Sequence, residues 1–196
     1  MKFGPLAVEE AEGAILAHSL KLESGPLRKG SVLSADDVAR LKAAGIESVI
    51  AAVLDADDLG EDAAALAVGT CLETPGLRLG NVFTGRVNLI AETAGIVRVD
   101  TGAIAALNTI DEGLTIATIP DLMRVDADQL VATVKIIPYA LPDKVVKAGA
   151  EALGDAPVRL HPFRGGTARL VMTRTPGFKT SLLEKGEEVV CCLLYT

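Results

Sequence analysis

Aromatic residues are scarce in this chain of 196 residues, which has four Phe, two Tyr and no Trp. A buried core must therefore be built mainly from Ala, Val, Leu and Ile. The scarcity argues against platforms that stack nucleic-acid bases and against aromatic cages for cations.

Positive charge is also in short supply. The chain has 19 Lys and Arg residues against 26 Asp and Glu residues, a net charge of −7. No overall positive field can attract nucleic-acid phosphates or anionic lipid. No run approaches the roughly 20 apolar residues of a membrane span, and the start, MKFGPLAVEE, lacks the apolar segment of a signal peptide. We therefore expect a cytoplasmic protein that binds neither nucleic acid nor membranes.

The residues that most often form metal and nucleophilic sites are few and scattered. Cys71, Cys191 and Cys192 lack the spaced pairs of a zinc site, and adjacent cysteines rarely bond to each other, so a reduced compartment fits best. His18 and His161 lie far apart in sequence, and a structural role is favoured for both. Cys71 is expected to be a small core residue. Neither a serine-hydrolase elbow, a zinc-protease helix nor a phosphate-binding loop motif occurs, so we predict no catalytic residue and no protein-bound metal.

Residues 1–75 form the first predicted unit, of hairpin, helix, strand and helix. Ser34 stands three residues before Asp37, a capping-box pattern, and Gly45 suits the end of the helix between them. The predicted elements are a strand over 13–22, a turn at 24–26, a strand over 27–33, a helix from 34 to 45, a buried strand over 46–54 and a helix over 61–72.

Residues 76–156 form the second unit, which is rich in predicted strands. Asp100 can cap a short helix that runs through Leu107, and Asn108 and Asp111 at its exit can bond backbone groups or face a cleft. Strands are predicted over 77–79, 87–91, 95–99, 115–119 and 130–137, and a helix over 143–153. Strands and helices do not alternate regularly, so the fold class is α+β.

Residues 157–196 form the third segment, with strands predicted over 158–160 and 168–173. The loop that follows, over 173–181, combines two cations, four hydroxyl groups and a glycine ahead of a predicted helix. This composition is typical of an anion site, because a helix N-terminus offers free amide groups.

A second candidate anion site lies near the start of a predicted strand. Thr84, Gly85, Arg86 and Asn88 combine close backbone approach with a fork-shaped cation and an amide, a set that suits a phosphate or the edge of a pterin. Equally, Arg86 could close a tight turn and pair with Glu92 or Asp100.

Lys135 is unusual because it lies among apolar residues in VATVKIIPY. Its ammonium group must extend to solvent, pair with an acid or face a ligand. Exposure on an edge strand is the simplest of these interpretations, and a ligand contact is the functional one.

Five short motifs together resemble a known family. They are GRVNL (85–89), GIVRVD (95–100), ALNTID (106–111), TIATI (115–119) and VATVKIIP (131–138). With them, the chain resembles the N-terminal region of bacterial molybdopterin-binding proteins of molybdenum cofactor biosynthesis, of the type fused to a nucleotidyltransferase-like domain. The resemblance implies that molybdopterin is the ligand, and that any transferase chemistry lies in segments missing from this chain.

The resemblance also gives residues 157–196 a meaning, as the start of a truncated α/β molybdopterin-binding domain. In that domain the loop after the first strand lies near the ligand, which implies roles for Thr173, Arg174, Lys179 and Ser181. The sequence TRTPG departs here from the acidic TGxE-like sequence of molybdopterin adenylyltransferases.

The sequence therefore predicts a molybdopterin-binding module in which binding is favoured over catalysis. The candidate ligand-binding residues are Gly85, Arg86, Asn88, Lys135, Thr173, Arg174, Lys179 and Ser181. One alternative is a structural module that forms a homodimer through open strand edges and orients an attached transferase domain. Another is a small-molecule enzyme that uses Arg86 and Lys135. Convergence of Arg86, Asn88 and Lys135 on one pocket would favour ligand binding over the structural role.

Overall fold

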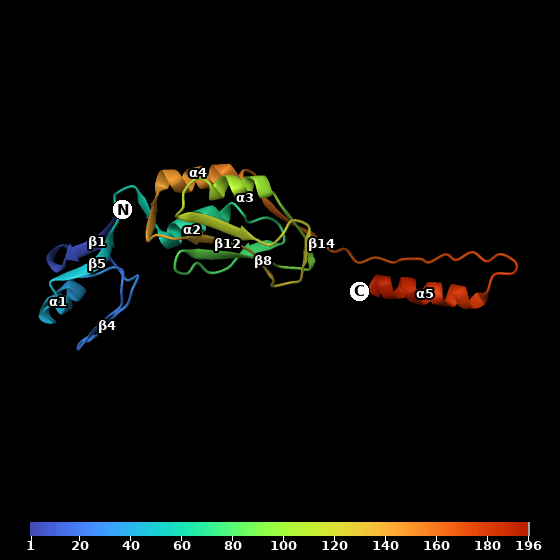
Figure 1. The fold of residues 1–196 in the computed structure, drawn as a ribbon, viewed down its shortest axis with the longest axis horizontal. Coiled ribbons are helices and arrows are strands. Elements are labelled where there is room, and N and C mark those ends of the chain that lie inside the picture. Colours follow the sequence, from blue (N-terminus) through green and yellow to red (C-terminus); the bar gives the residue numbers. More distant parts are fainter. Residues whose placement is uncertain (196) are drawn as a thin grey trace. The chain divides into compact units, whose positions relative to one another are not determined.

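The fold is known from a computed structural model, which describes residues 1–195. It comprises two compact units, residues 1–163 and the residues from 164 onward, and each is described by itself (Figure 1). All strand pairings are antiparallel among the described residues. Helices and antiparallel strands do not form repeating β-α-β units, so the predicted α+β class is confirmed.

The first part of the larger unit has a small hydrophobic core of its own, which includes Val8, Leu16, Leu33 and Leu41. A sheet of order β1-β5-β2 and a separate β3–β4 hairpin contribute to it, together with helix α1. The elements are β1 (Lys2–Ala7), the 3-10 helix η1 (Val8–Glu10), β2 (Ile15–Leu16), β3 (Leu20–Leu22), β4 (Gly25–Leu27), α1 (Ala35–Ala43) and β5 (Ser48–Val53). The strand predicted over 13–22 is thus divided into β2 and β3.

Helix α1 begins and ends where local chemistry predicts. The Ser34 side chain accepts a hydrogen bond from the Asp37 amide, and the Asp37 carboxylate accepts one from the Ser34 amide, which completes the capping box. Gly45 follows the helix with φ of +70°, a conformation that glycine adopts without steric cost. Val38 and Leu41 are the buried residues of this helix.

The second core of this unit is larger and lies between three helices and two sheets. Its sheets have the orders β10-β12-β8-β7 and β11-β9-β14, and β6 pairs with β13. The elements are β6 (Asp58–Gly60), α2 (Glu61–Thr70), β7 (Leu77–Leu79), β8 (Arg86–Ala91), β9 (Gly95–Val99), α3 (Thr101–Asn108), β10 (Leu114–Thr118), β11 (Met123–Val125), β12 (Leu130–Ile136), β13 (Ala140–Pro142), α4 (Asp143–Leu153) and β14 (Val158–Pro162).

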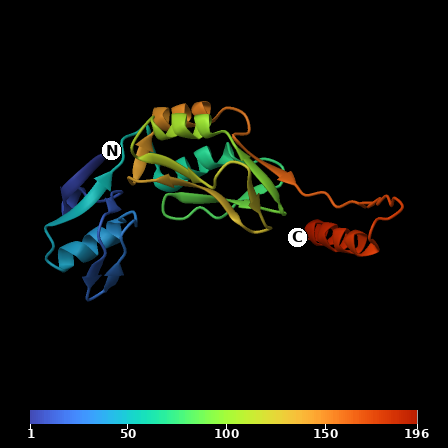
Figure 2. The ribbon, with the colours of Figure 1, turned by 45° about the vertical axis from the view of Figure 1, so that its right-hand side comes forward.

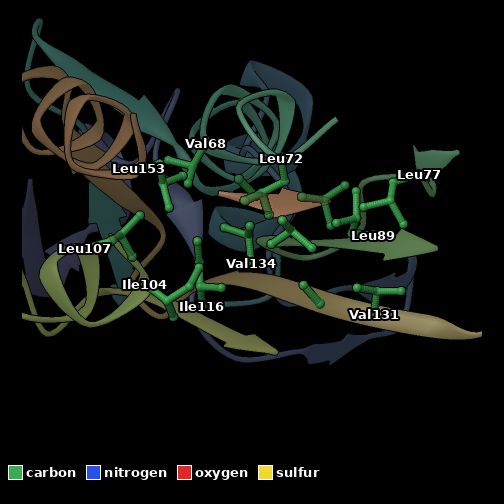
Figure 3. Close-up of a cluster of buried hydrophobic side chains, with 14 of the residues drawn as sticks. Val68, Leu72, Leu77, Leu89, Ile104, Leu107, Ile116, Val131, Val134 and Leu153 are labelled. Carbon is green, nitrogen blue, oxygen red and sulfur yellow. The ribbon is translucent and has the colours of Figure 1, made fainter. Parts of the chain in front are cut away.

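One face of the four-stranded sheet is buried against the helices. Side chains from α2, α3 and α4, among them Val68, Leu107 and Leu153, point toward Val134 and Leu89 of the sheet (Figure 3). Alternate strand residues point the other way, because side chains alternate between the two faces of a strand. The helices therefore cover one face and leave the opposite face of this sheet to solvent.

Close packing of α2 on the sheet depends on a small residue. A Cβ atom placed on Gly69 would lie 2.5 Å from Cγ1 of Val87. Helix α2 packs into the larger core through Ala64, Ala65 and Val68. The sequence alone predicts this helix as part of the first unit, residues 1–75. Neither helical periodicity nor capping could indicate which core this helix would join.

Side-chain contacts join the two cores of this unit around Tyr139. The Tyr139 hydroxyl donates to the Ala17 carbonyl at 3.2 Å, and its ring stacks on Phe3 with 6.1 Å between centroids. Close to Phe3 in sequence, the Met1 α-amino group lies 2.7 Å from the Asp58 carboxylate, which is almost fully buried.

The second unit contains one helix, α5 (Thr180–Tyr195), preceded by residues without regular secondary structure (Figure 2). The strand predicted over 168–173 is not formed. An isolated strand leaves its backbone groups without ladder partners, and nothing in the described part of this unit supplies a second strand. Within residues 1–195, no helix is both long enough and apolar enough to cross a membrane.

Candidate functional site

Three of the predicted site residues meet on the solvent face of the four-stranded sheet. Arg86 and Asn88 project from β8, and Lys135 projects from β12. They line one shallow concavity of about 390 Å³. Its other lining residues are Thr115, Ile116, Ala117, Leu130 and Thr133.

Strand register arranges the face of this sheet in three rows. In the first row Arg86 pairs with Lys135, which in turn pairs with Thr115. The second row holds Asn88, Thr133 and Ala117, and the third holds Leu130, Ile90 and Arg78 of β7. Unpaired cations thus lie in the first row and an amide and a hydroxyl in the second, while the third combines two aliphatic side chains with Arg78, which is paired with Asp128.

Neither cation of the first row is neutralised by the protein. Among the described residues, Arg86 and Lys135 form no ion pair, although several other arginines do. The alternative in which Arg86 pairs with Glu92 or Asp100 is therefore not formed among the described residues. Two neighbouring cations on a water-exposed face repel each other, and an anion placed between them would relieve that repulsion.

The polar side chains of the middle row are joined to each other. The Thr133 hydroxyl donates to Oδ1 of Asn88 at 2.9 Å, while the Thr115 hydroxyl donates to the Lys135 carbonyl at 3.2 Å. Both bonds hold side chains on the sheet face without using the donor groups of Asn88, Arg86 or Lys135. The face consequently presents hydrogen-bond donors of Arg86 and Lys135 toward solvent.

Gly85 occupies a buried turn immediately before the site. Its φ is +65°, and its amide donates to the Asp62 carboxylate at 2.7 Å. Its carbonyl accepts from the Ile136 amide at 2.7 Å. Both backbone groups are therefore used within the protein, and Gly85 acts by setting the entry of β8.

A second carboxylate lies beside this turn at the start of α2. Burial raises the pKa of Glu61 above its ordinary value, the adjacent Asp62 raises it further, and Lys29 opposes the change. A Cβ atom on Gly85 would approach Oε2 of Glu61 to 2.9 Å. The turn thus brings the carboxylates of Glu61 and Asp62 near the Gly85 amide. Of the two, Asp62 accepts the hydrogen bond from that amide.

Two polar residues of the concavity, Thr115 and Thr133, were missed from the sequence, as were its apolar residues Ile116, Ala117 and Leu130. Thr115 and Thr133 lie in predicted strands, and period-two alternation puts them on the same faces as their neighbours Ala117 and Lys135. However, alternation does not tell which strands pair, and here β8 pairs with β12, a strand distant in sequence. Only the register brings the threonines beside Asn88.

The remaining four predicted residues belong to the second unit. Thr173, Arg174 and Lys179 lie in its irregular segment, and Ser181 is near the start of α5. All four are exposed.

A second hollow, of about 600 Å³, lies on the sheet β11-β9-β14 and has mixed charge. Arg98 and Arg159 pair directly across β9 and β14, and His161 lines the same hollow. Asp121 accepts from the Val99 amide at 2.9 Å and from Nε of Arg98 at 3.1 Å, and these bonds, led by the amide, lower its pKa. The neighbouring carboxylates offset the arginines, so this hollow is a poorer anion site than the first.

His18 and Cys71 do not line the concavity. His18 is exposed, and Cys71 packs against the larger core, where burial raises its thiol pKa. Within the described part of the chain, no group of three or more His, Cys, Asp or Glu side chains is placed to hold a metal ion.

Asn108 and Asp111 have structural partners at the exit of α3. The Asn108 amide accepts from the Ile116 amide at 2.8 Å and donates to the Ile116 carbonyl at 2.9 Å. Asp111 accepts from the Gly113 amide at 2.8 Å. Both side chains bond backbone groups, the first of the two roles that the sequence allowed.

Comparison with known protein families gives a match to the first part of the chain. A family described as a domain of unknown function (DUF8806) matches residues 5–53, which include the end of β1 and all of α1 and β5. No curated protein matches the chain, and no solved structure matches it. The matched segment does not include the concavity at Arg86 and Lys135.

Proposed function

We propose that this chain is a molybdopterin-binding module that acts in molybdenum cofactor biosynthesis. The observation that supports the proposal is the convergence of Arg86, Asn88 and Lys135 in one concavity on the open sheet face. These residues lie in two of the motifs that carry the family resemblance, GRVNL and VATVKIIP. Transferase chemistry is not assigned to this chain.

The chemistry of the concavity suits the parts of molybdopterin. A terminal phosphate matches the unpaired cations of the first row, because charge-assisted hydrogen bonds are the strong ones. The pterin ring carries polar edges, which match the amide of Asn88. Its flat faces match the exposed aliphatic side chain of Leu130, which lines the concavity.

Calorimetric titration of the chain with purified molybdopterin tests this proposal. We expect micromolar binding to the wild-type chain. An Arg86→Ala, Lys135→Ala double variant should lose that binding, because both phosphate ligands are removed. Arg124→Ala is the matched control, since Arg124 is an exposed strand arginine of the other sheet and already pairs with Asp126 at 3.3 Å. Equal binding by the wild type and the double variant would contradict the assignment of the site.

A structural module that orients an attached domain is the second candidate. The open edges of β1 and β10 favour it, because each strand is the last in its sheet among the described residues. Unpaired edges can pair with a second copy of the chain. Absence of molybdopterin binding together with a dimer in analytical ultracentrifugation would favour this candidate over the first.

A further inference from the structure

We propose that the hollow on the sheet β11-β9-β14 binds a small zwitterion, with the ligand's carboxylate at Arg159 and its ammonium group at Asp155. The ligand class is an α-amino acid, in which one carbon atom carries both charged groups. This hollow shares no lining residue with the concavity at Arg86 and Lys135, so the inference stands apart from the proposed function.

Three segments of the larger unit form the walls of the hollow. They are the outer face of β9 and β14, the start of α3, and the connection over 155–157 that leads into β14. The volume of about 600 Å³ is within the range of small-molecule sites. Charged and polar residues predominate in the lining, so a small polar molecule suits it better than an apolar one.

Two opposite charges in this hollow have no partner within the described part of the chain. The Arg159 guanidinium forms no ion pair there, and its Nη2 donates to the Asp155 backbone carbonyl at 3.4 Å. The Asp155 carboxylate likewise forms no ion pair with a described residue. Because the guanidinium bonds the backbone of the residue that carries the carboxylate, the two charges lie near each other.

A ligand that carries both signs of charge satisfies both groups. A simple anion would be attracted by Arg159 and repelled by Asp155, and a simple cation would meet the reverse. A zwitterion can form a charge-assisted hydrogen bond with each of them. The fork of the guanidinium matches a carboxylate in particular, because both groups are planar and two parallel bonds can form.

The neighbouring arginine strengthens the preference of Arg159 for a carboxylate. Arg98 faces Arg159 directly across β9 and β14, and like charges in this position repel each other. Asp121 offsets Arg98, because its carboxylate accepts from Nε of Arg98 at 3.1 Å and from the Val99 amide at 2.9 Å. Both contacts are to β9, so the described chain holds no carboxylate at Arg159 on β14.

The connection that carries Asp155 is fixed by its own backbone. Ala156 has a φ of +50°, which is uncommon for a residue with a side chain. The Pro157 carbonyl accepts from the Asp100 amide at 2.8 Å, which joins the connection to the residue between β9 and α3. A site that is ordered before the ligand arrives loses less entropy on binding.

Titration of the isotopically labelled chain with L-serine, followed by nuclear magnetic resonance, tests the inference. N-acetyl-L-serine lacks the ammonium charge and L-serine methyl ester lacks the carboxylate, so each keeps one of the two contacts. We expect L-serine to shift the backbone signals of residues 98–101 and 155–161. It should bind about tenfold more tightly than either blocked compound, the order expected for one hydrogen bond to a charged group.

Arg159→Gln and Asp155→Asn each remove one charge and should affect different compounds. Arg159→Gln should weaken L-serine about tenfold without weakening the methyl ester, which makes no carboxylate contact. Asp155→Asn should weaken L-serine by about the same factor without weakening N-acetyl-L-serine. A merely structural role for either residue would weaken all three compounds alike.

Arg124→Gln is the matched control for these variants. Arg124 is an exposed arginine of β11 in the same sheet, but it pairs with Asp126 and does not line the hollow. This variant should leave the affinity for L-serine unchanged.

Equal affinity of the wild-type chain for L-serine and both blocked compounds would overturn the inference, as would shifts confined to signals outside the hollow. O-phosphoethanolamine carries an ammonium group and a phosphate on a longer spacer. Tighter binding of that compound than of L-serine would overturn the assignment to an amino acid. None of these outcomes involves molybdopterin, so they are distinct from failure of the proposed function.

Discussion

Arg86 and Lys135 are direct cross-strand partners on β8 and β12, so two cations face each other on the open side of the sheet. No acid among the described residues pairs with either of them. Like charges directly opposite each other destabilise a sheet, and here no ion pair within the described chain offsets the repulsion. An arrangement that weakens the free protein and favours a bound anion is typical of a binding site.

Removal of one cation should therefore stabilise the ligand-free protein. Lys135→Thr is expected to raise the free energy of unfolding by about 0.5 kcal/mol at low salt, because it removes the repulsion and suits a strand. The gain should vanish at about 1 M salt, where charges are screened within a few ångströms. Denaturant unfolding at both salt concentrations measures the change.

Arg124→Thr is the control for this prediction, since it removes an exposed arginine that is paired with Asp126. It should not stabilise the protein. A Lys135→Thr variant less stable than the wild type at low salt would contradict the repulsion argument.

Gly85→Ala should be more damaging than the same change at a freer glycine. The new Cβ atom would lie 2.9 Å from the Ile136 carbonyl and 2.9 Å from Oε2 of Glu61, in addition to the strain of φ at +65°. We expect a loss of about 2–3 kcal/mol in thermal or denaturant unfolding.

Gly45→Ala separates the two causes. Gly45 has a similar φ of +70°, but no atom lies within 4 Å of the position that its new Cβ atom would take. The expected loss is about 1 kcal/mol, from backbone strain alone. Equal losses at the two glycines would show that the close approach at Gly85 is relieved by movement of its neighbours.

Asn108 should be important for stability although it touches no proposed ligand. Its side chain bonds both the amide and the carbonyl of Ile116, and so joins the end of α3 to β10. Asn108→Ala leaves both backbone groups without these partners and should cost about 2 kcal/mol in denaturant unfolding. Asn108→Asp keeps an acceptor for the amide but loses the donor, so its loss should be smaller. An unchanged Asn108→Ala variant would contradict this role.

The stability of the chain should depend on pH through the Met1 amine. Hydrogen bonds to Asp55 first and then to Asp58 raise the pKa of that amine above its ordinary 8.0. Its stabilising contribution is therefore complete below pH 8.0 and is lost as the pH rises through the raised value.

Asp58 adds the opposite dependence at acidic pH. The hydrogen bond from the Met1 amine, followed by that from the Asp55 amide, lowers its pKa below the ordinary 3.8. Its contribution is present above pH 3.8 and is lost as the pH falls through the lowered value. Thermal melting across this range should fall at both ends. Asp58→Asn should remove the acidic fall that Asp58 causes and reduce the alkaline fall only in part, because Asp55 still bonds the Met1 amine. An unchanged pH profile in that variant would contradict the pairing.

Much of the local structure could be predicted because its causes are close in sequence. The capping box of Ser34 and Asp37 starts α1, and Asp100 caps α3 by accepting from the Ala103 amide. Helix α4 has the predicted bounds, Asp143–Leu153. Such elements depend on turns and capping hydrogen bonds between residues a few positions apart. These interactions form largely independently of the rest of the fold.

The strand over 168–173 shows the limit of that reasoning. Its apolar pattern is that of a buried strand, yet Leu170, Val171 and Met172 are exposed and form no ladder. A strand is stabilised by partners that its own sequence does not contain.

By itself, the sequence determined the α+β class, the capped helices and the types of residue available for an anion site. These follow from composition, from periodicity and from short-range hydrogen bonds. The tertiary structure alone decided that Arg86 faces Lys135, that Thr133 bonds Asn88 and that α2 joins the larger core. The reason is physical: strand register and helix packing are set by contacts between residues distant in the chain, where side-chain volume and burial decide which pairing is stable.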